Sequence, residues 1–338
     1  MILRILTCVT VLLMTTSNGW AWGPKGHALV GEIAYGQLSP NAKAQVSAIL
    51  GFTLSESATW LDCVKSVYKK PTGEFKFEES PSHPEWTRPS CIPFMDGGPE
   101  IERMQDYVSR NWSNCVYSGG TRGCHESYHF ADIAIQRDDY ADDRIGAAEH
   151  DIVHTANAAI AVLRGMPSPS GFSIKDKKEA IFILAHLIGD MHQPLHVGSV
   201  YLDADGKLVD PDAGTYDPAT ENRGGNDLVT GAGNFHSEWD SIPDYSTAQK
   251  TQMISDARLV PVTAGPADKW IKAWASEGIM NSRVVFAGAK YGAKLAAGRW
   301  PISFEDPALH VQDENQIKRG QLIKAGVRLA QLLNTVWP

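Results

Sequence analysis

The stretch from Ser173 to Met191 constrains the fold more than any other part of the sequence. Its apolar residues recur at helical spacing, which predicts one amphipathic helix with a face turned toward the core. Ser173 with Asp176 resembles a capping box that would open this helix. His186 and Asp190 lie four residues apart, so their side chains share one face. Because that face is otherwise apolar, the Asp190 carboxylate needs a buried partner, and a metal ion is an obvious one.

Other segments also favour helices. Ser39-Pro40 is a cap and first-turn pair followed by apolar residues on one face. The segment from Ile317 to Leu333 is amphipathic. We find no repeating alternation of apolar and polar residues, so we expect an all-α fold with long loops. Stretches at about 63–124, which contains cysteines, and 200–224 are interpreted as insertions in one multi-helix domain of residues 22–338, since neither lies between two self-sufficient cores.

Residues 1–21 have the pattern of a secretory signal. Arg4 provides a short positive start, Ile5 to Met14 is almost wholly apolar, and Gly19 and Ala21 place small residues at −3 and −1 of a cut before Trp22. The alternative is a membrane anchor, but the run is shorter than the roughly 20 residues that span a bilayer. We therefore expect a secreted or periplasmic protein that starts at Trp22 and has no membrane span.

The cysteine count fits an exported protein. Of the five cysteines, Cys8 lies in the predicted signal, which leaves Cys63, Cys91, Cys115 and Cys124. An even number after export suggests two disulfides. Four cysteines allow three pairings, of which Cys63–Cys91 with Cys115–Cys124 is the simplest. Asn111-Trp-Ser113 is a glycosylation sequon that matters only in a eukaryotic host.

The charge of the chain limits its partners. The sequence has 31 lysines and arginines against 39 aspartates and glutamates, a formal net charge of −8. Such a chain has no general electrostatic attraction for nucleic acid or anionic lipid. A polyanionic partner therefore requires a local positive centre.

A second group of histidines and aspartates repeats the spacing of the first. His236 and Asp240 are four residues apart, and His196 follows the segment Gln193-Pro194-Leu195. Imidazole nitrogen with carboxylate oxygen is typical of catalytic zinc, which keeps one position open for water. A single His/Asp pair is more often a structural hydrogen bond. Two such pairs together with His196 favour a metal site.

Longer motifs make the pattern specific. They are His186-Leu-Ile-Gly-Asp190-Met-His-Gln-Pro-Leu-His196, Gly224-Gly-Asn226 followed by His236 and Asp240, Trp22-Gly23 with His27, Ala58-Thr-Trp-Leu-Asp62, His129-Phe-Ala-Asp132, Trp274-Ala-Ser-Glu277 and Ala325-Gly-Val-Arg-Leu-Ala330. Together they resemble the zinc-dependent single-strand nucleases of the S1/P1 family. The resemblance runs from Trp22 to about Asn334, outside the insertions. It implies an α-helical fold of the phospholipase C/nuclease P1 type with three zinc ions in a cleft.

The resemblance also implies a ligand set. The first zinc would be held by Asp62, His129, His186 and Asp190. The second would be held by His196, His236 and Asp240. The third would be held by the amino group and carbonyl oxygen of Trp22, by His27, and by Asp190 as a bridge. Because Trp22 can ligate only after the signal is cut, the enzyme is expected to be inactive before export.

The implied activity is cleavage of single-stranded DNA and RNA to 5′-phosphate products, together with 3′-nucleotidase activity, by a protein expected to be a monomer. Asp62 and Asp190 are the implied catalytic residues, with Asp62 orienting the attacking water and the second zinc neutralising the leaving 3′-oxygen. The implied substrate contacts are Lys65, Phe130, Asp132, Asn226 and Ser241. For Lys65 the alternative is a solvated surface lysine, and for Phe130 it is a core aromatic.

Three alternatives stay open. The 66 residues between Asp62 and His129 exceed the usual gap of the family, and His125 lies four residues before His129. A zinc-dependent phospholipase C shares the three-zinc plan, but it typically has glutamate in place of Asp240. A non-catalytic zinc-binding secreted protein is disfavoured because no position of the implied ligand set is lost.

Overall fold

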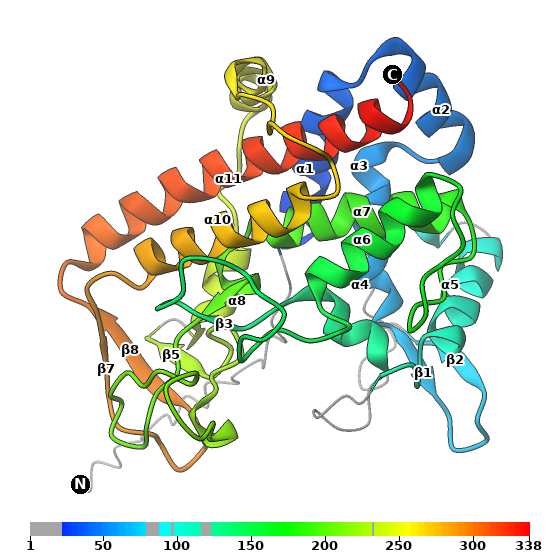
Figure 1. The fold of residues 1–338 in the computed structure, drawn as a ribbon. Helices are drawn as coiled ribbons and strands as arrows, with labels where there is room; N and C mark the ends of the chain where they lie inside the picture. Colours follow the sequence, from blue (N-terminus) through cyan, green and yellow to red (C-terminus); the bar gives the residue numbers. More distant parts are fainter. Residues whose placement is uncertain (1–21, 79–87, 96–97, 116–122, 232) are drawn as a thin grey trace, which may run out of the picture.

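The structure is a computed structural model that describes residues 22–78, 88–95, 98–115, 123–231 and 233–338. Helices dominate it and the strands are short (Figure 1), which confirms the predicted helical fold class. The helices are α1 (Pro24–Gln37), α2 (Pro40–Leu50), α3 (Leu54–Ser57), α4 (Trp60–Val64), α5 (Gly98–Arg110), α6 (Ile152–Leu163), α7 (Lys177–Met191), α8 (Phe235–Asp240), α9 (Thr247–Asp256), α10 (Trp270–Val285) and α11 (Pro307–Val336). The predicted signal segment lies outside the described residues.

Helix α7 lies at the centre of the molecule. It contacts α1, α2, α3, α4, α6, α10 and α11, and every residue from Glu179 to Met191 is buried. The side chain of Asp176 caps the helix by accepting a hydrogen bond from the backbone N–H of Glu179. The predicted capping box at Ser173 is therefore wrong. The backbone N–H of Ser173 instead donates to the side chain of Asn111, three residues before α7 is capped.

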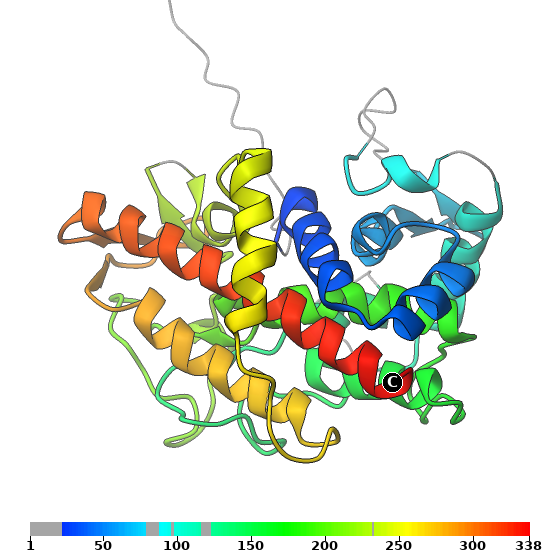
Figure 2. The same cartoon turned by 90° about the horizontal axis from the view of Figure 1, so that it is seen from above.

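Helix α11 spans the width of the molecule beside α10 (Figures 1 and 2). It begins ten residues before the predicted start at Ile317, because the carboxylate of Asp306 caps it by accepting from the N–H groups of Ala308 and Leu309. Its buried face packs on α1. A Cβ at Gly326 would lie 2.5 Å from Cγ2 of Ile33, so glycine permits this close packing. The helix predicted at Ser39-Pro40 is present as α2, and Ser39 caps it by accepting from the N–H of Ala42.

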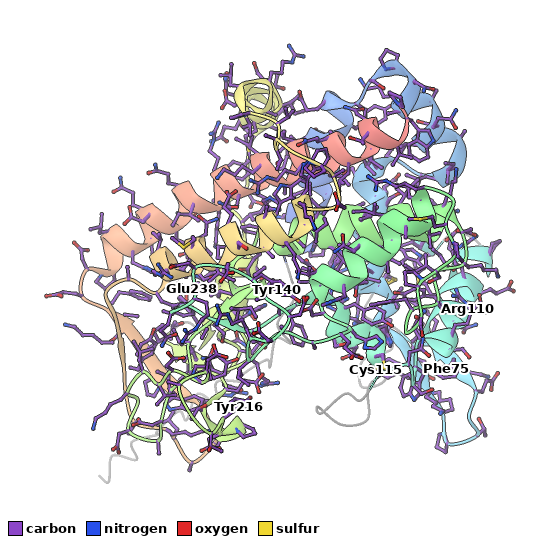
Figure 3. All side chains as sticks on the ribbon, in the orientation of Figure 1. Phe75, Arg110, Cys115, Tyr140, Tyr216 and Glu238 are labelled. Atoms are coloured by element: carbon purple, nitrogen blue, oxygen red, sulfur yellow. A yellow bond between two sulfur atoms is a disulfide. The ribbon has the colours of Figure 1, made fainter. Side chains whose placement is uncertain are left out.

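The strands form small sheets that the sequence did not reveal. They are β1 (Val67–Lys69), β2 (Phe75–Phe77), β3 (Ile133–Ala134), β4 (Gly198–Ser199), β5 (Leu228–Thr230), β6 (Gly233–Asn234), β7 (Ala289–Tyr291) and β8 (Trp300–Phe304). The largest sheet has the order β6-β5-β8-β7, in which only the β5–β8 pair is parallel. A second, smaller core lies here, with Phe235, Trp239 and Trp300 among its buried residues. Glu238 of α8 lies on this side of the molecule, away from Phe75 and Cys115 (Figure 3).

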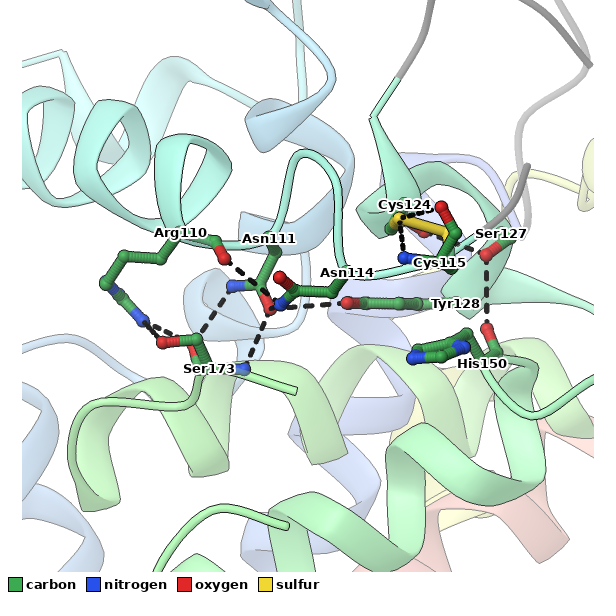
Figure 4. The surroundings of a disulfide bond; sticks show 9 residues. All are labelled: Arg110, Asn111, Asn114, Cys115, Cys124, Ser127, Tyr128, His150 and Ser173. Atoms are coloured by element: carbon green, nitrogen blue, oxygen red, sulfur yellow. Dashed lines mark hydrogen bonds between the residues drawn. A yellow bond between two sulfur atoms is a disulfide. The ribbon is translucent and has the colours of Figure 1, made fainter. Parts of the chain in front are cut away.

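The predicted number of two disulfides is confirmed, and their pairing, Cys63–Cys91 with Cys115–Cys124, is the simplest of the three possible ones. Cys63 belongs to α4, so its disulfide holds the segment around Cys91 against the helix that carries Asp62. The second disulfide lies beside Asn111 (Figure 4). The Asn111 side chain is fully buried and donates to the carbonyls of Tyr107 and Ser173, so the folded protein has no room for a glycan there. No helix in the described part of the chain is long and apolar enough to cross a bilayer.

Candidate metal centre

Five buried side chains from four segments converge to form what we call the first cluster. Its members are His27 of α1, Asp62 of α4, His129 of the 3₁₀ helix Cys124–His129, and His186 and Asp190 of α7. Within it, His27, His186 and Asp190 form one set and Asp62, His129 and His186 another. In each set the ligand atoms lie within 4.8 Å of one another. The helical spacing of His186 and Asp190 therefore does bring both side chains to one point, as the sequence predicted.

The distances in the first cluster are short. Asp190 Oδ1 lies 3.1 Å from Nε2 of His27, and Oδ2 lies 3.0 Å from Nδ1 of His129 and 3.2 Å from Nε2 of His186. Asp62 Oδ1 lies 3.7 Å from Nε2 of His186. Asp190 thus faces three imidazole rings at once. This geometry suits a carboxylate that bridges two cations.

His196, His236 and Asp240 form the second cluster. His196 ends the 3₁₀ helix Pro194–His196, and the other two lie one turn apart on α8. The Nε2 atoms of His196 and His236 are 3.2 Å apart, and Asp240 Oδ2 lies 3.6 Å from Nε2 of His236. All three side chains are buried.

Backbone carbonyls orient three of these imidazoles. The Nδ1 atoms of His186, His196 and His236 lie 2.8, 2.7 and 2.6 Å from the carbonyl oxygens of residues 58, 129 and 224, respectively. An Nδ1–H that donates to a carbonyl leaves Nε2 as a lone pair, which is the tautomer and orientation typical of a metal ligand. The Nε2 atoms of His196 and His236 then face each other, and Nε2 of His186 faces the carboxylates of Asp62 and Asp190. Burial disfavours the charged form of His186, but these two carboxylates outweigh it and raise the pKa of His186.

Buried polar atoms without hydrogen-bond partners also indicate that these side chains bind metal ions. Asp62 Oδ2, Asp240 Oδ2 and His129 Nε2 are buried and have no hydrogen-bond partner among the described residues. A buried, unpaired carboxylate oxygen is costly unless a cation is near. Imidazole nitrogen with carboxylate oxygen is the ligand combination of catalytic zinc sites. The residues present therefore fit zinc in both clusters.

Burial keeps most of the imidazoles in the neutral, ligating form. It lowers the pKa of His27, His129 and His196, and it lowers the pKa of His236 to about 3. Burial alone would raise the pKa of Asp62, but the nearby Lys65 ammonium and the imidazoles outweigh it and lower that pKa to about 2. Asp62 is therefore a carboxylate at neutral pH, and Lys65 Nζ lies 2.8 Å from its Oδ1.

Two glycines are needed for these positions. A Cβ at Gly189 would lie 2.9 Å from Nδ1 of His27, so glycine lets α1 approach α7 at the first cluster. Gly224 has φ +58°, and a Cβ there would lie 2.3 Å from the carbonyl oxygen of Leu195. The left-handed turn at Gly224 presents the carbonyl that accepts from His236. The Gly224-Gly-Asn226 motif thus builds the second cluster.

The chain was compared with models of known protein families. The model described as S1/P1 Nuclease matches residues 22–100 and 106–338, far more than half of the chain. The chain belongs to the S1/P1 nuclease family. It is accordingly a nuclease, a hydrolase acting on nucleic acid, in a family of zinc-dependent enzymes. A comparison with curated proteins found no match.

The other predicted site residues of this family member lie as follows. Trp22 is fully buried, and its ring approaches Gly26 and Gly189 beside His27. Lys65 lies at Asp62, not on the open surface, with a side chain 17% exposed. Phe130 is half-buried and Asp132 is buried, both directly after His129.

Asn226 and Ser241 lie near the second cluster. The Asn226 side-chain amide donates to the carbonyl of Arg223 and accepts from the side chain of Asn234. It therefore stabilises the turn in which it lies. Ser241 directly follows α8 and is exposed. Both stay predicted substrate contacts.

Two further histidines of the described residues, His125 and His150, do not join either cluster. His125 is buried near Trp112 and is absent from the ligand sets that contain His129. His150 precedes α6 instead of sharing a helix with His154, and it packs near Phe172. The geometry thus favours His129 over His125 as the ligand after Asp62.

Several residues that hold the second cluster were missed by sequence reasoning. Gln193 Nε2 donates to Asp240 Oδ1 at 2.7 Å. Lys318 of α11 is buried, pairs with Glu314, and donates to the carbonyls of Glu238 and Ser241 at the end of α8. Gln193 could have been found, because it lies inside the long histidine motif. Lys318 left no signal, because only the fold brings it near Asp240.

Proposed function

We propose that this S1/P1 family nuclease is a secreted enzyme that uses three zinc ions to cleave single-stranded DNA and RNA to 5′-phosphate products, and that it also removes phosphate from 3′-nucleotides. The observation that carries the proposal is the pair of buried histidine–aspartate clusters: the ligand atoms of each set lie within 4.8 Å of one another, and Asp62 Oδ2 and Asp240 Oδ2 have no hydrogen-bond partner among the described residues. Such a centre supplies the local positive charge that an acidic chain needs to bind a polyanion.

In this proposal Asp62, His129, His186 and Asp190 hold the first zinc. His196, His236 and Asp240 hold the second. Trp22, His27 and Asp190 hold the third. The family match begins at Trp22, the residue that the predicted cut exposes, and Trp22 packs beside His27. Zinc bound at these positions supplies Lewis acidity toward the phosphate and lowers the pKa of water to roughly 7.

The protein residues then orient the reactants. Lys65 keeps Asp62 ionised and leaves Asp62 Oδ2 without a hydrogen bond from the described residues, so this oxygen can accept a hydrogen bond from the attacking water and orient it. Phe130 offers a half-buried ring on which an unpaired base can stack, an interaction worth about 1–3 kcal/mol. Burial, and the neighbouring Glu221 carboxylate, raise the pKa of Asp132, so its carboxyl group can donate to a base edge. Base pairing hides these faces, which favours single strands.

The test uses the exported protein. We expect Edman sequencing to begin at Trp22, elemental analysis to find three zinc ions per chain, and the protein to cleave single-stranded oligonucleotides and 3′-adenosine monophosphate in preference to duplex DNA. A form that keeps one methionine before Trp22 is expected to bind two zinc ions. Asp313→Asn, on the exposed surface of α11, is the control variant.

Two outcomes would overturn the proposal. Cleavage of phosphatidylcholine without cleavage of nucleic acid would make the protein a phospholipase C. Three bound zinc ions without any phosphodiesterase activity would make it a non-catalytic zinc-binding protein.

A further inference from the structure

A cavity of about 540 Å³ opens beside the second cluster. Its walls come from three places: the start of α1, the end of α8 with the residues that follow, and the segment 88–90. Asp240 belongs both to the cavity lining and to the second cluster. The backbone N–H of Gly23, another lining residue, donates to the Asp240 carbonyl at 2.8 Å. The cavity therefore adjoins the second cluster through Asp240.

Two cationic side chains stand in the cavity lining. Lys25 is exposed and pairs with the exposed Asp244. Such a surface ion pair contributes little to stability, so an incoming phosphate can replace Asp244 at small cost. Arg88 is half-buried, and its Nη2 donates to the Tyr68 hydroxyl at 3.3 Å. The Cys63–Cys91 disulfide fixes the segment that carries Arg88 to α4.

Serine residues add polar groups to the lining. Ser90, Ser237 and Ser241 all belong to it. The Oγ atoms of Ser90 and Ser237 are buried, so neither reaches a ligand in the cavity. Ser241 is exposed, and its hydroxyl donates to the carbonyl of Ser237 at 3.0 Å, which leaves its oxygen able to accept a hydrogen bond from a ligand.

The rest of the lining is apolar. Pro24, Pro89 and Ile242 lie between the polar groups. The volume falls within the roughly 300–1,000 Å³ typical of small-ligand pockets, which combine an apolar lining with a few polar anchors. An apolar lining that also includes two cationic side chains and the exposed Ser241 suits the sugar and base of a nucleotide together with its phosphates.

We propose that this cavity binds the nucleotide of a single strand next to the phosphodiester that is cleaved, with Lys25 and Arg88 contacting its backbone phosphates. The proposal rests on the proposed function and adds a specificity to it. A 3′-mononucleotide has no neighbouring phosphodiester to occupy the cavity. The cavity therefore raises activity on polynucleotides without affecting activity on mononucleotides.

The test compares two substrates in two variants. Arg88→Gln and Lys25→Gln are each expected to lower kcat/KM for a twelve-residue oligothymidylate about 3- to 10-fold at 50 mM salt, and to leave 3′-adenosine monophosphate hydrolysis unchanged. Each lost phosphate contact is expected to reduce the slope of log(kcat/KM) against log[salt] by about 0.7. Arg258→Gln and Lys207→Gln, both exposed, are the matched controls.

A binding measurement separates this proposal from the proposed function. Fluorescence anisotropy with the zinc-loaded protein and a labelled, cleavage-resistant phosphorothioate oligothymidylate reports occupancy without chemistry, and both variants are expected to bind more weakly than the controls. Equal losses on both substrates, or no loss on the oligonucleotide, would overturn the cavity proposal while hydrolysis itself persisted. Absence of any hydrolysis with weakened binding in the variants would leave the cavity proposal standing and overturn the proposed function.

Discussion

The two clusters of ligands are built in different ways. Three members of the first cluster, His27, His186 and Asp190, lie on the regular helices α1 and α7 within the larger core. Its other two members lie on the five-residue α4 and on a 3₁₀ helix. The second depends on a six-residue helix and a single 3₁₀ turn beside the smaller core. A helix of six residues is too short to be stable by itself. The first cluster thus inherits its geometry from core packing, and the second needs bonds from distant residues.

Those bonds are identifiable. Lys318 holds the carbonyls at the end of α8, Gln193 holds Asp240, and the N–H of Gly23 holds the Asp240 carbonyl. A metal-ligating side chain on a long helix of the core therefore needs few additional hydrogen bonds to fix its position. A ligand at the edge of the fold needs several. Substitutions in and around each cluster can test this difference.

The largest effect is expected from Asp190→Asn, which removes the carboxylate that faces three imidazoles of the first cluster. Loss of several kcal/mol of transition-state stabilisation corresponds to about 10³-fold or more in rate. Single-strand cleavage and zinc content measure the effect. The variant is expected to lose zinc from the first cluster and to keep it in the second. Simultaneous loss of all zinc would show that the two clusters are one cooperative unit.

Lys318→Met tests the support of the second cluster. It removes the ammonium at the end of α8 and leaves Glu314 buried without its partner. We expect zinc binding at the second cluster to weaken about 10- to 100-fold, as for other groups that orient metal ligands. Competition with a chromophoric chelator measures this affinity, and the double variant Glu314→Gln/Lys318→Met guards against loss of folding. Lys324→Met, on the same helix but paired with Glu277, is the control. An unchanged zinc affinity would show that Lys318 does not support the second cluster.

Gly189→Ala tests the close packing beneath the first cluster. The added Cβ would meet His27 at 2.9 Å, and we expect a loss of about 1–3 kcal/mol in the free energy of unfolding, the usual cost of overpacking. Gly320→Ala in α11 is the matched control, because its Cβ would have no neighbour within 4 Å. The control is expected to gain about 0.5–1 kcal/mol from helix propensity. Urea unfolding measures both, and equal effects would contradict the packing argument.

The smallest effect is expected from Glu277→Gln, which lies outside both clusters. Burial favours the neutral carboxyl, but hydrogen bonds from Arg328 and Lys324 outweigh it and lower the pKa of Glu277 to about 2. Because the unfolded value is about 4.3, these bonds stabilise the fold above that pH and their contribution is lost as the pH falls toward 2.

Because Glu277 is partly exposed, we expect Glu277→Gln to lower the free energy of unfolding by about 1 kcal/mol at pH 7 and by less at pH 3. Urea unfolding of the wild-type protein and the Glu277→Gln variant at both pH values measures it. A loss that grows on acidification would contradict the sign of this linkage. The zinc content is expected to stay unchanged, since Glu277 is not a ligand.

Much of the fold could be predicted from local patterns. The apolar periodicity of α7 located the central helix, and the cysteine positions indicated the disulfides. The start of α7 was misassigned because Ser173 bonds to Asn111 instead of capping the helix, which is a tertiary preference that no local rule contains. The start of α11 was missed because its first turns are exposed and lack an apolar stripe. All described strands except β8 have only two or three residues, which is too short for an alternating pattern to appear, and the pairs β3–β4 and β5–β8 join segments far apart in the chain.

The candidate site shows the same division. The sequence by itself determined which side chains share a helix face, such as His186 with Asp190 and His236 with Asp240, because a helix returns to the same face after four residues. It also determined the donor chemistry. Only the tertiary structure decided that Asp62 and His129 meet α7, that Lys318 reaches α8, and that a cavity opens beside Asp240. These placements depend on the packing of elements far apart in the chain, and local spacing holds no information about packing between such elements.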